Sequence, residues 1–142
     1  MANRTPVHLW IVAVLATLWN AFGCFDYLMT QTRNEQYLAG FTDPQRAYFD
    51  SFPIWMESAW AFGVWGGMLG SLLLLARSRH AVAAFAVSLA GLAVSTVYQY
   101  LLSTPLPEMR SGAMVAMNLV IWAVAIGLLV YAMRMRKRGV LR

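Results

Sequence analysis

The chain has 142 residues, of which 60% are hydrophobic and only 12% are charged, and its formal net charge is +5. A soluble domain carries about twice that share of charged residues, so the composition excludes an ordinary soluble globular protein. The main basic cluster directly follows an apolar segment and has no accompanying aromatic or glycine pattern, so we expect no nucleic-acid binding. The one cysteine, Cys24, excludes an internal disulfide and any CxxC motif.

Four apolar segments are each long enough to cross a bilayer, because a helix of about 20 apolar residues spans the hydrocarbon core. We predict an all-α membrane protein, a single domain built as an antiparallel bundle of four transmembrane helices. The connection at residues 77–80 is short enough to make consecutive helices neighbours. The predicted spans cover residues 7–29, 53–76, 81–103 and 112–133, and a basic tail covers residues 134–142.

The polar side chains of the first span include Asn20 in its interior and Asp26 near its end. Polar groups enter the apolar part of a membrane at a cost, so they mark candidates for function. Asp26 also suits a structural role at the interface, as a cap or as a partner of Arg33 or Arg110. Asn20 equally suits an interhelical hydrogen bond.

The connection between the first two spans, residues 30–53, is the only long one. Asp43 can cap a helix that begins at Pro44, whose fixed φ suits the first helical position. Three aromatic residues follow at near-helical spacing: Tyr48, Phe49 and Phe52. We therefore predict a short interfacial helix with its aromatic face in the headgroup region, and we favour membrane anchoring over a ligand-binding aromatic box.

The second span carries a ridge of small residues that recur every three or four positions. Such ridges let helix backbones approach closely in lipid, where no hydrophobic effect drives helices together. We expect this span to be the packing centre of the bundle. The ridge consists of Ala59, Gly63, Gly66, Gly67, Gly70 and Ser71.

Glu57 is the one charged residue inside the second span, about one turn from its start. At about 100° per residue it points away from the ridge, so it faces either a looser cavity or the headgroups. Intramembrane acids are functional candidates, whereas a carboxylate one turn into a helix also favours the helix dipole and can reach water. Both roles stay open for Glu57.

The third and fourth spans each add a carboxamide near the same side of the membrane. Gln99 lies near the end of the third span, and Asn118 lies early in the fourth. Carboxamides at such positions also serve as hydrogen-bonding groups between helices. We predict a candidate solute or proton site in this third of the bundle, formed by Glu57, Asp26, Asn20, Gln99 and Asn118.

Basic residues divide unevenly between the two sides of the predicted bundle. The side richer in Lys and Arg is cytoplasmic by the positive-inside rule, so we place both termini and residues 77–80 in the cytoplasm. The acidic residues then lie toward the outer side. Four basic residues after the last span are positioned to attract anionic headgroups: Arg134, Arg136, Lys137 and Arg138.

We predict no enzymatic activity and no cofactor. The sequence has no Ser-His-Asp set, phosphate loop or HExxH motif, and it has no cluster of metal ligands. His8 and His80 share one side of the membrane, which raises a haem hypothesis. Both lie at span ends beside water rather than buried at matching depth, so we do not favour it.

Several segments carry a family resemblance: Trp19–Gly23, Phe25–Asn34, Phe41–Thr42, Phe52–Pro53, Trp60, Val64–Gly67 and Leu69–Leu75. They resemble a family of small bacterial four-span membrane proteins, whose members are sometimes labelled sugar transporters. The resemblance covers roughly the first three spans and the outer loop, without the last span and the basic tail. It implies a multi-pass protein of the bacterial inner membrane, and it brings no established functional residues to this chain.

Two functions of different class fit the sequence. In the first, a homo-oligomer moves a small solute in a proton-linked manner, with Glu57 and Asp26 exchanging protons. In the second, the chain is a non-catalytic accessory or assembly subunit of a larger membrane complex, which it contacts through the glycine-rich second span and the aromatic loop.

Overall fold

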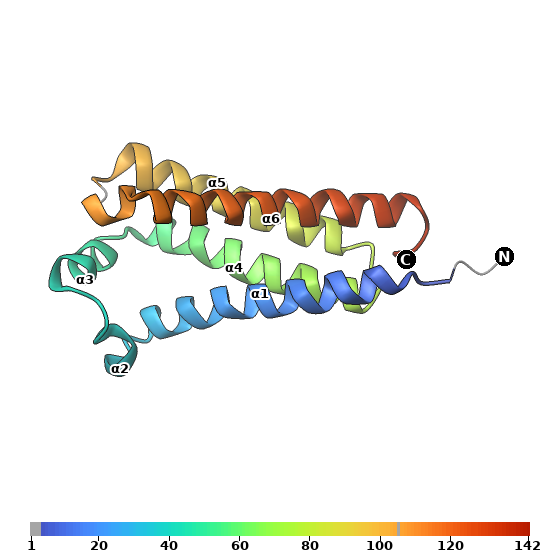
Figure 1. Cartoon of the computed structure of the whole chain (residues 1–142), viewed down its shortest axis with the longest axis horizontal. Helices are drawn as coiled ribbons and strands as arrows, with labels where there is room; N and C mark the ends of the chain where they lie inside the picture. The colour runs from blue at the N-terminus through green and yellow to red at the C-terminus, as the bar shows by residue number, and fades with distance from the viewer. Residues whose placement is uncertain (1–3, 105) are drawn as a thin grey trace.

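The computed structural model describes residues 4–104 and 106–142, and over these ranges the chain is an all-helical bundle (Figure 1). We call the end that carries α2 and α3 the loop end, and the end that carries both termini the terminal end. Consecutive long helices run in opposite directions between these two ends. The elements are α1 (Val7–Gln31), α2 (Glu35–Leu38), α3 (Asp43–Asp50), α4 (Ile54–Leu75), α5 (Ala81–Val97), the π-helical turn η1 (Tyr98–Leu102), the 3-10 turn η2 (Pro107–Arg110) and α6 (Gly112–Lys137).

In the described residues four helices are long and apolar enough to cross a membrane, which confirms the prediction of four helices of spanning length. Two boundaries differ from the prediction by two residues or more, and the others agree to within one residue. α1 continues to Gln31, and α6 continues through Arg134 and Arg136 to Lys137, so the basic segment begins as helix and not as tail. Arg and Lys are good helix formers, and their charge favours a helix C-terminus, so the helix outlasts the apolar segment.

The long connection holds α2 and α3, but the predicted cap of α3 is wrong. The N-cap is Thr42, whose hydroxyl accepts the backbone N–H of Gln45, while the Gln45 side chain accepts the backbone N–H of Thr42. This reciprocal box satisfies two backbone donors at once. Asp43 lies in the first turn instead, where its charge still favours the positive end of the helix.

The closest packing in the bundle is between α4 and α5. The Ser88 hydroxyl donates to the carbonyl of Gly63 at 2.6 Å. A Cβ atom added to Gly91 would lie 2.5 Å from the Ala59 carbonyl oxygen, and one added to Gly66 would lie 3.1 Å from the backbone nitrogen of Ser88. Backbone therefore lies against backbone along this seam, where a larger residue has no space.

An adjoining face of α4 packs on α1 through a different part of the small-residue ridge. Gly67 lies directly against the Asn20 carboxamide, which donates to the Ser71 hydroxyl at 3.0 Å. The Cys24 thiol lies 3.5 Å from the carbonyl of Val64, to which it donates. The ridge thus serves two neighbours, because Gly63, Gly66 and Gly70 face α5 while Gly67 and Ser71 face α1.

At the terminal end all four long helices meet in one apolar cluster. Leu9 of α1, Leu74 of α4, Phe85 of α5 and Met135 of α6 are all buried there. The last residues fold back into this cluster, since Val140 and Leu141 are also buried in it. Backbone hydrogen bonds from Arg142 to the Arg77 carbonyl (2.8 Å) and from Arg79 to the Arg142 carbonyl (2.9 Å) hold the segment against the turn between α4 and α5.

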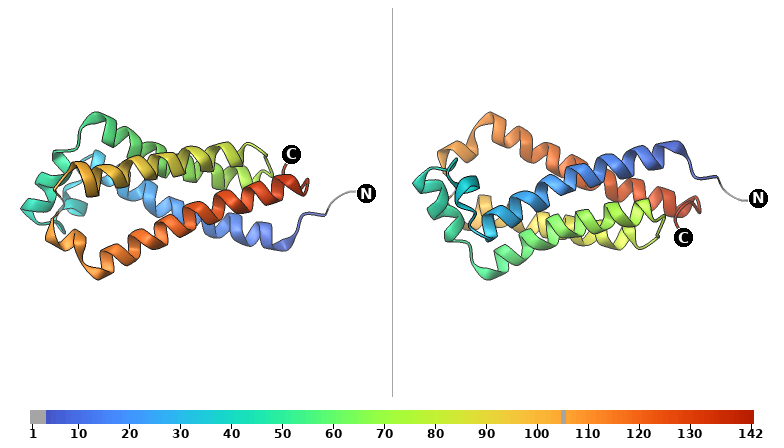
Figure 2. Two further views of the ribbon diagram at one scale, coloured as in Figure 1. Left: turned by 90° about the horizontal axis from the view of Figure 1, so that it is seen from above. Right: turned by 90° about the horizontal axis from the view of Figure 1, so that it is seen from below.

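Toward the loop end α6 diverges from α1 (Figure 2). The two helices are joined near the terminal end, where His8 and Tyr131 share a hydrogen bond of 2.5 Å. α6 packs mainly on α5, and no residue of its most apolar stretch is buried. The bundle is therefore closed at the terminal end and open between α1 and α6 at the loop end.

The α4–α5 seam predicts opposite effects for the same substitution at two glycines. Gly91→Ala should destabilise the bundle by about 1–3 kcal/mol, because the added methyl group forces two backbones apart. Gly127→Ala on α6 is the matched control, because a Cβ atom there meets nothing within 4 Å. It should be neutral or stabilising by up to about 1 kcal/mol, the usual advantage of Ala in a helix. Thermal unfolding in detergent measures both, and equal effects would contradict the seam.

Candidate functional site

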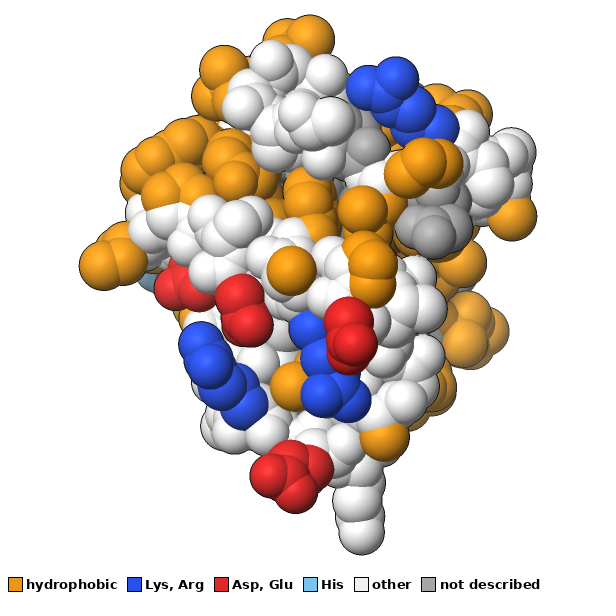
Figure 3. Space-filling model, turned by 90° about the vertical axis from the view of Figure 1, so that its left-hand side faces the viewer, with side chains coloured by type: hydrophobic (Ala, Val, Ile, Leu, Met, Phe, Trp, Pro, Cys, Tyr) orange, Lys and Arg blue, Asp and Glu red, His pale blue; other side chains and the backbone are white. Residues whose placement is uncertain are grey.

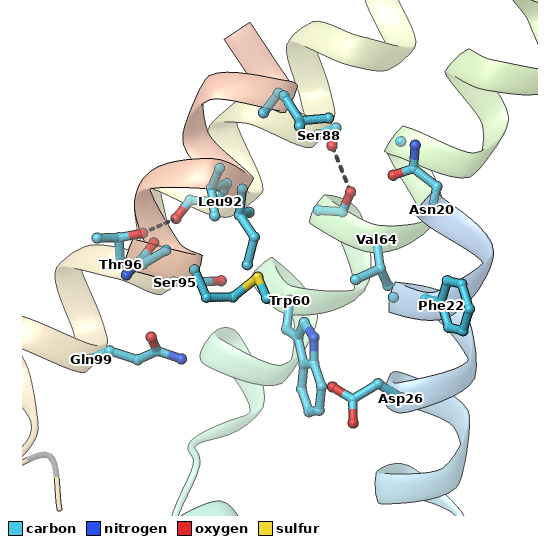
Figure 4. A pocket seen from close by; sticks show the side chains of 18 of the residues that line it. Asn20, Phe22, Asp26, Trp60, Val64, Ser88, Leu92, Ser95, Thr96 and Gln99 are labelled. Carbon is cyan, nitrogen blue, oxygen red and sulfur yellow. Dashed lines mark hydrogen bonds between the residues drawn. The ribbon is translucent and has the colours of Figure 1, made fainter. Parts of the chain in front are cut away.

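The divergence of α6 leaves a central cavity of about 590 Å³ inside the bundle (Figure 4). α1, α4, α5 and α6 form its walls, and Phe49 and Phe52, in and just after α3, close its loop end. The lining is mainly apolar. A volume of this size suits a small organic molecule, since ligand pockets are usually concave, mostly apolar and supplied with a few polar groups.

Four of the five predicted site residues line this cavity, and they come from three helices. Asn20 and Asp26 belong to α1, Gln99 follows α5, and Asn118 belongs to α6. Glu57 is not among the lining residues. Its side chain is half-buried and makes no hydrogen bond or ion pair with any other residue in the described ranges.

The carboxamides in the cavity differ in how many of their donors and acceptors already have a partner within the protein. Asn20 donates to Ala16 and Ser71, and Asn118 donates to the Tyr100 hydroxyl at 3.0 Å. Within the described residues the Gln99 side chain makes no hydrogen bond, and Figure 4 shows it reaching into the cavity from the α5 side. Gln99 therefore has both donors and its acceptor available for a ligand.

The hydroxyl groups in the lining are mostly occupied. Ser88 and Ser95 donate to the carbonyls of Gly63 and Gly91. Thr96 donates to Leu92 and accepts the indole N–H of Trp122 at 3.2 Å. The Ser88 bond connects α5 to α4 and the Trp122 bond connects α6 to α5, whereas the bonds to Gly91 and Leu92 stay within α5. These hydroxyls therefore serve first in packing and in helix backbone contacts.

Asp26 has a different partner from the two that the sequence suggested. Its carboxylate accepts a hydrogen bond from the Tyr37 hydroxyl of α2. Arg33 instead forms an ion pair with Asp50 at 3.5 Å, between two exposed side chains. Burial, followed by the hydrogen bond to Asp26 and the negative charge of Asp26, raises the pKa of Tyr37 to about 12. Tyr37 therefore stays a neutral donor over the whole physiological range.

Aromatic residues of the loop and of α4 also reach the cavity. Phe49, Phe52 and Trp60 line it, and the Phe52 and Trp60 rings meet edge to face at 6.4 Å. The sequence of this loop by itself favours membrane anchoring. The spacing of Phe49 and Phe52 predicts that both rings lie on nearly the same side of the loop, which is the sequence feature that could have indicated cavity lining. Only the folded structure shows that this side covers a cavity.

The cavity opens sideways, between α1 and α6. Residues of both helices line the cavity and are solvent-accessible, among them Phe22 (77% exposed) on α1 and Met117 (51% exposed) on α6. Both residues lie within helices of membrane-spanning length. In a bilayer this opening would therefore face lipid and not water.

Charged side chains lie at the two ends of the bundle. Figure 3 looks onto the loop end, where acidic and basic side chains lie close together beside apolar surface. At the opposite end α6 finishes with exposed Arg134, Arg136 and Lys137, and Arg138 follows directly. His8 bonds Tyr131 at this end, and His80 is exposed there. No group of three His, Cys, Asp or Glu side chains that could hold a metal occurs among the described residues.

Four apolar helices of spanning length around an internal cavity define a multi-pass helical membrane protein. No family model, curated protein or solved structure matches the chain. The resemblance to small bacterial four-span proteins therefore stays a prediction.

Tyr37 predicts a specific pH dependence. Its pKa is about 12 in the folded chain, against about 10 for an unfolded tyrosine. The stability that Tyr37 contributes is therefore complete below about pH 10 and is lost as the pH rises toward about 12. The melting temperature of Tyr37→Phe should fall less steeply over this interval than that of the unsubstituted protein. Parallel curves would show that Tyr37 is not held as a neutral donor.

Proposed function

We propose that the protein binds a small, largely apolar solute in the central cavity and carries it through the membrane. The observation that supports this proposal is the cavity itself, which lies between helices of spanning length and collects Asn20, Asp26, Gln99 and Asn118. A purely structural bundle gains nothing from such a space, because an unfilled cavity forfeits packing contacts and costs stability.

In this proposal the proton-linked role passes from Glu57 to Asp26. Asp26 is the carboxylate that lines the cavity, whereas Glu57 lies outside it. A group that exchanges protons in step with solute has to contact the space that the solute occupies, or lie one hydrogen bond from it. Asp26 meets this requirement.

We also propose an orientation of the chain in the membrane and a homo-oligomeric assembly. The basic terminal end suits the cytoplasmic side of a bacterial inner membrane, where Arg134, Arg136, Lys137 and Arg138 would contact anionic headgroups. α2 and α3 then lie in the outer interface. A second copy packed on the uncovered surface of α6 would close the open side of the cavity, which is the reason to propose a homo-oligomer.

The cavity can be filled from α6 to test solute binding. Ala125 of α6 lines the cavity, whereas Ala90 of α5 is exposed and does not line it. Ala125→Trp should reduce binding by about tenfold or more, because the indole occupies the ligand volume, and Ala90→Trp should leave it unchanged. The probes are tetraphenylphosphonium, triphenylphosphine oxide and tetraphenylborate, three arylated compounds with positive, zero and negative charge.

Binding is measured by equilibrium dialysis with the full chain in phosphatidylcholine nanodiscs, against nanodiscs without protein. The proposal requires at least one of the three probes to bind in a protein-dependent manner. It fails if none does, or if the two tryptophan variants behave alike.

The accessory or assembly function is the second candidate, and the bare surface of α6 is the observation that favours it. In this case a helix of a different membrane protein covers α6. Purification in a mild detergent should then give a fixed stoichiometry with that protein, and Ala123→Trp should disrupt the complex. A chain that purifies only with copies of itself would count against this function and would support the homo-oligomer.

A further inference from the structure

The charge of the central cavity comes from one residue. Asp26 is the only ionisable acid or base among the described Asp, Glu, Lys, Arg and His side chains that line it. No described basic side chain forms an ion pair with Asp26, and Arg33 is instead paired with Asp50. A carboxylate in such apolar surroundings is left without a counter-charge.

Tyr37 stabilises this carboxylate without cancelling its charge. The Tyr37 hydroxyl donates a hydrogen bond to one oxygen, Oδ1, of Asp26. The other carboxylate oxygen has no partner in the described part of the chain. The electrostatic balance of the site therefore favours a ligand that brings a positive charge and disfavours an anion.

The surroundings of Asp26 suit an organic cation. Figure 4 shows the Asp26 carboxylate pointing toward the indole ring of Trp60. Phe49 and Phe52 line the same end of the cavity. The negative face of an aromatic ring attracts a cation, and it does so most strongly where water is excluded. Across the cavity, Gln99 offers an unpaired carboxamide oxygen that can accept an N–H group of the ligand.

The rest of the cavity suits the apolar part of the same molecule. Phe85, Val124 and Leu128 line its deep part, toward the terminal end. The side opening between Phe22 and Met117 would face lipid, as described above. A ligand that fits both regions has a charged group at the loop end and an apolar body that is soluble in the bilayer.

We propose that the ligand of the central cavity is a hydrophobic organic cation, such as an aryl- or alkyl-substituted ammonium or phosphonium ion, held by Asp26 and the aromatic rings beside it. This assignment rests on the proposed solute-binding function and names the class of solute. Tetraphenylphosphonium represents the class. Triphenylphosphine oxide and tetraphenylborate keep similar aryl bulk while they remove or reverse the charge.

The decisive measurement compares the three probes on the same nanodiscs of uncharged phosphatidylcholine, so that lipid charge does not contribute. Tetraphenylphosphonium should bind the full chain at least about tenfold more tightly than triphenylphosphine oxide, and tetraphenylborate should show no protein-dependent binding. Asp26→Asn should remove the advantage of the cation, because it keeps the shape of the side chain and deletes its charge.

Glu57→Gln is the matched control. It removes a half-buried carboxylate at the same end of the bundle, but Glu57 does not line the cavity. This variant should bind tetraphenylphosphonium as the unsubstituted chain does. A second variant, Gln99→Lys, adds a positive charge to the opposite wall and should abolish cation binding while admitting tetraphenylborate. Circular dichroism and thermal unfolding confirm that each variant is folded.

The outcomes separate the two proposals. If triphenylphosphine oxide binds as tightly as the cation, or if Asp26→Asn binds the cation normally, the cation assignment is overturned and solute binding stands. If tetraphenylborate is preferred, the assignment is overturned as well. If no probe binds above the empty nanodiscs, both the assignment and the proposed function fall.

Discussion

The close approach of α4 and α5 is the constraint on which the other features of this protein depend. Gly63, Gly66 and Gly91 allow backbone to meet backbone, and the Ser88 hydroxyl bonds directly to the neighbouring helix. In lipid no hydrophobic effect drives two apolar helices together, so van der Waals contact and interhelical hydrogen bonds supply the attraction. Glycine maximises the van der Waals contact between the helices, because it has no side chain to hold them apart.

This tight pair determines where space is left. α1 packs on an adjoining face of α4 through Gly67 and Asn20, and α6 contacts mainly α5. Among the described residues, the two outer helices are buried against each other at the terminal end, where Leu9 and Met135 share one apolar cluster. They separate toward the loop end. The cavity exists because α4 and α5 are closely packed while α1 and α6 lie apart.

The sequence predicted much of the fold and part of the candidate site. Apolar length alone located the four spanning helices, because a helix must satisfy its backbone internally in lipid. Depth along the spans grouped Asn20, Asp26, Gln99 and Asn118, and all four line the cavity. Glu57 shares that depth but lies outside the cavity, because depth measures position along a helix and says nothing of which neighbour a helix face meets. The N-cap of α3 shows a similar limit of sequence-based prediction. Thr42 and Asp43 are adjacent and both suit an N-cap, and the sequence alone does not decide between them.

By itself, the sequence determined the number of spans, the small-residue ridge on α4 and the uneven distribution of charge, because these follow from composition and helical periodicity. Tertiary structure alone decided that the ridge serves two neighbours, that α6 stays largely uncovered, and that Asp26 pairs with Tyr37 from α2. Each of these depends on how far apart whole helices lie and how they are rotated about their axes. Those quantities come from the sum of many contacts across the bundle, and no single segment of the chain encodes them.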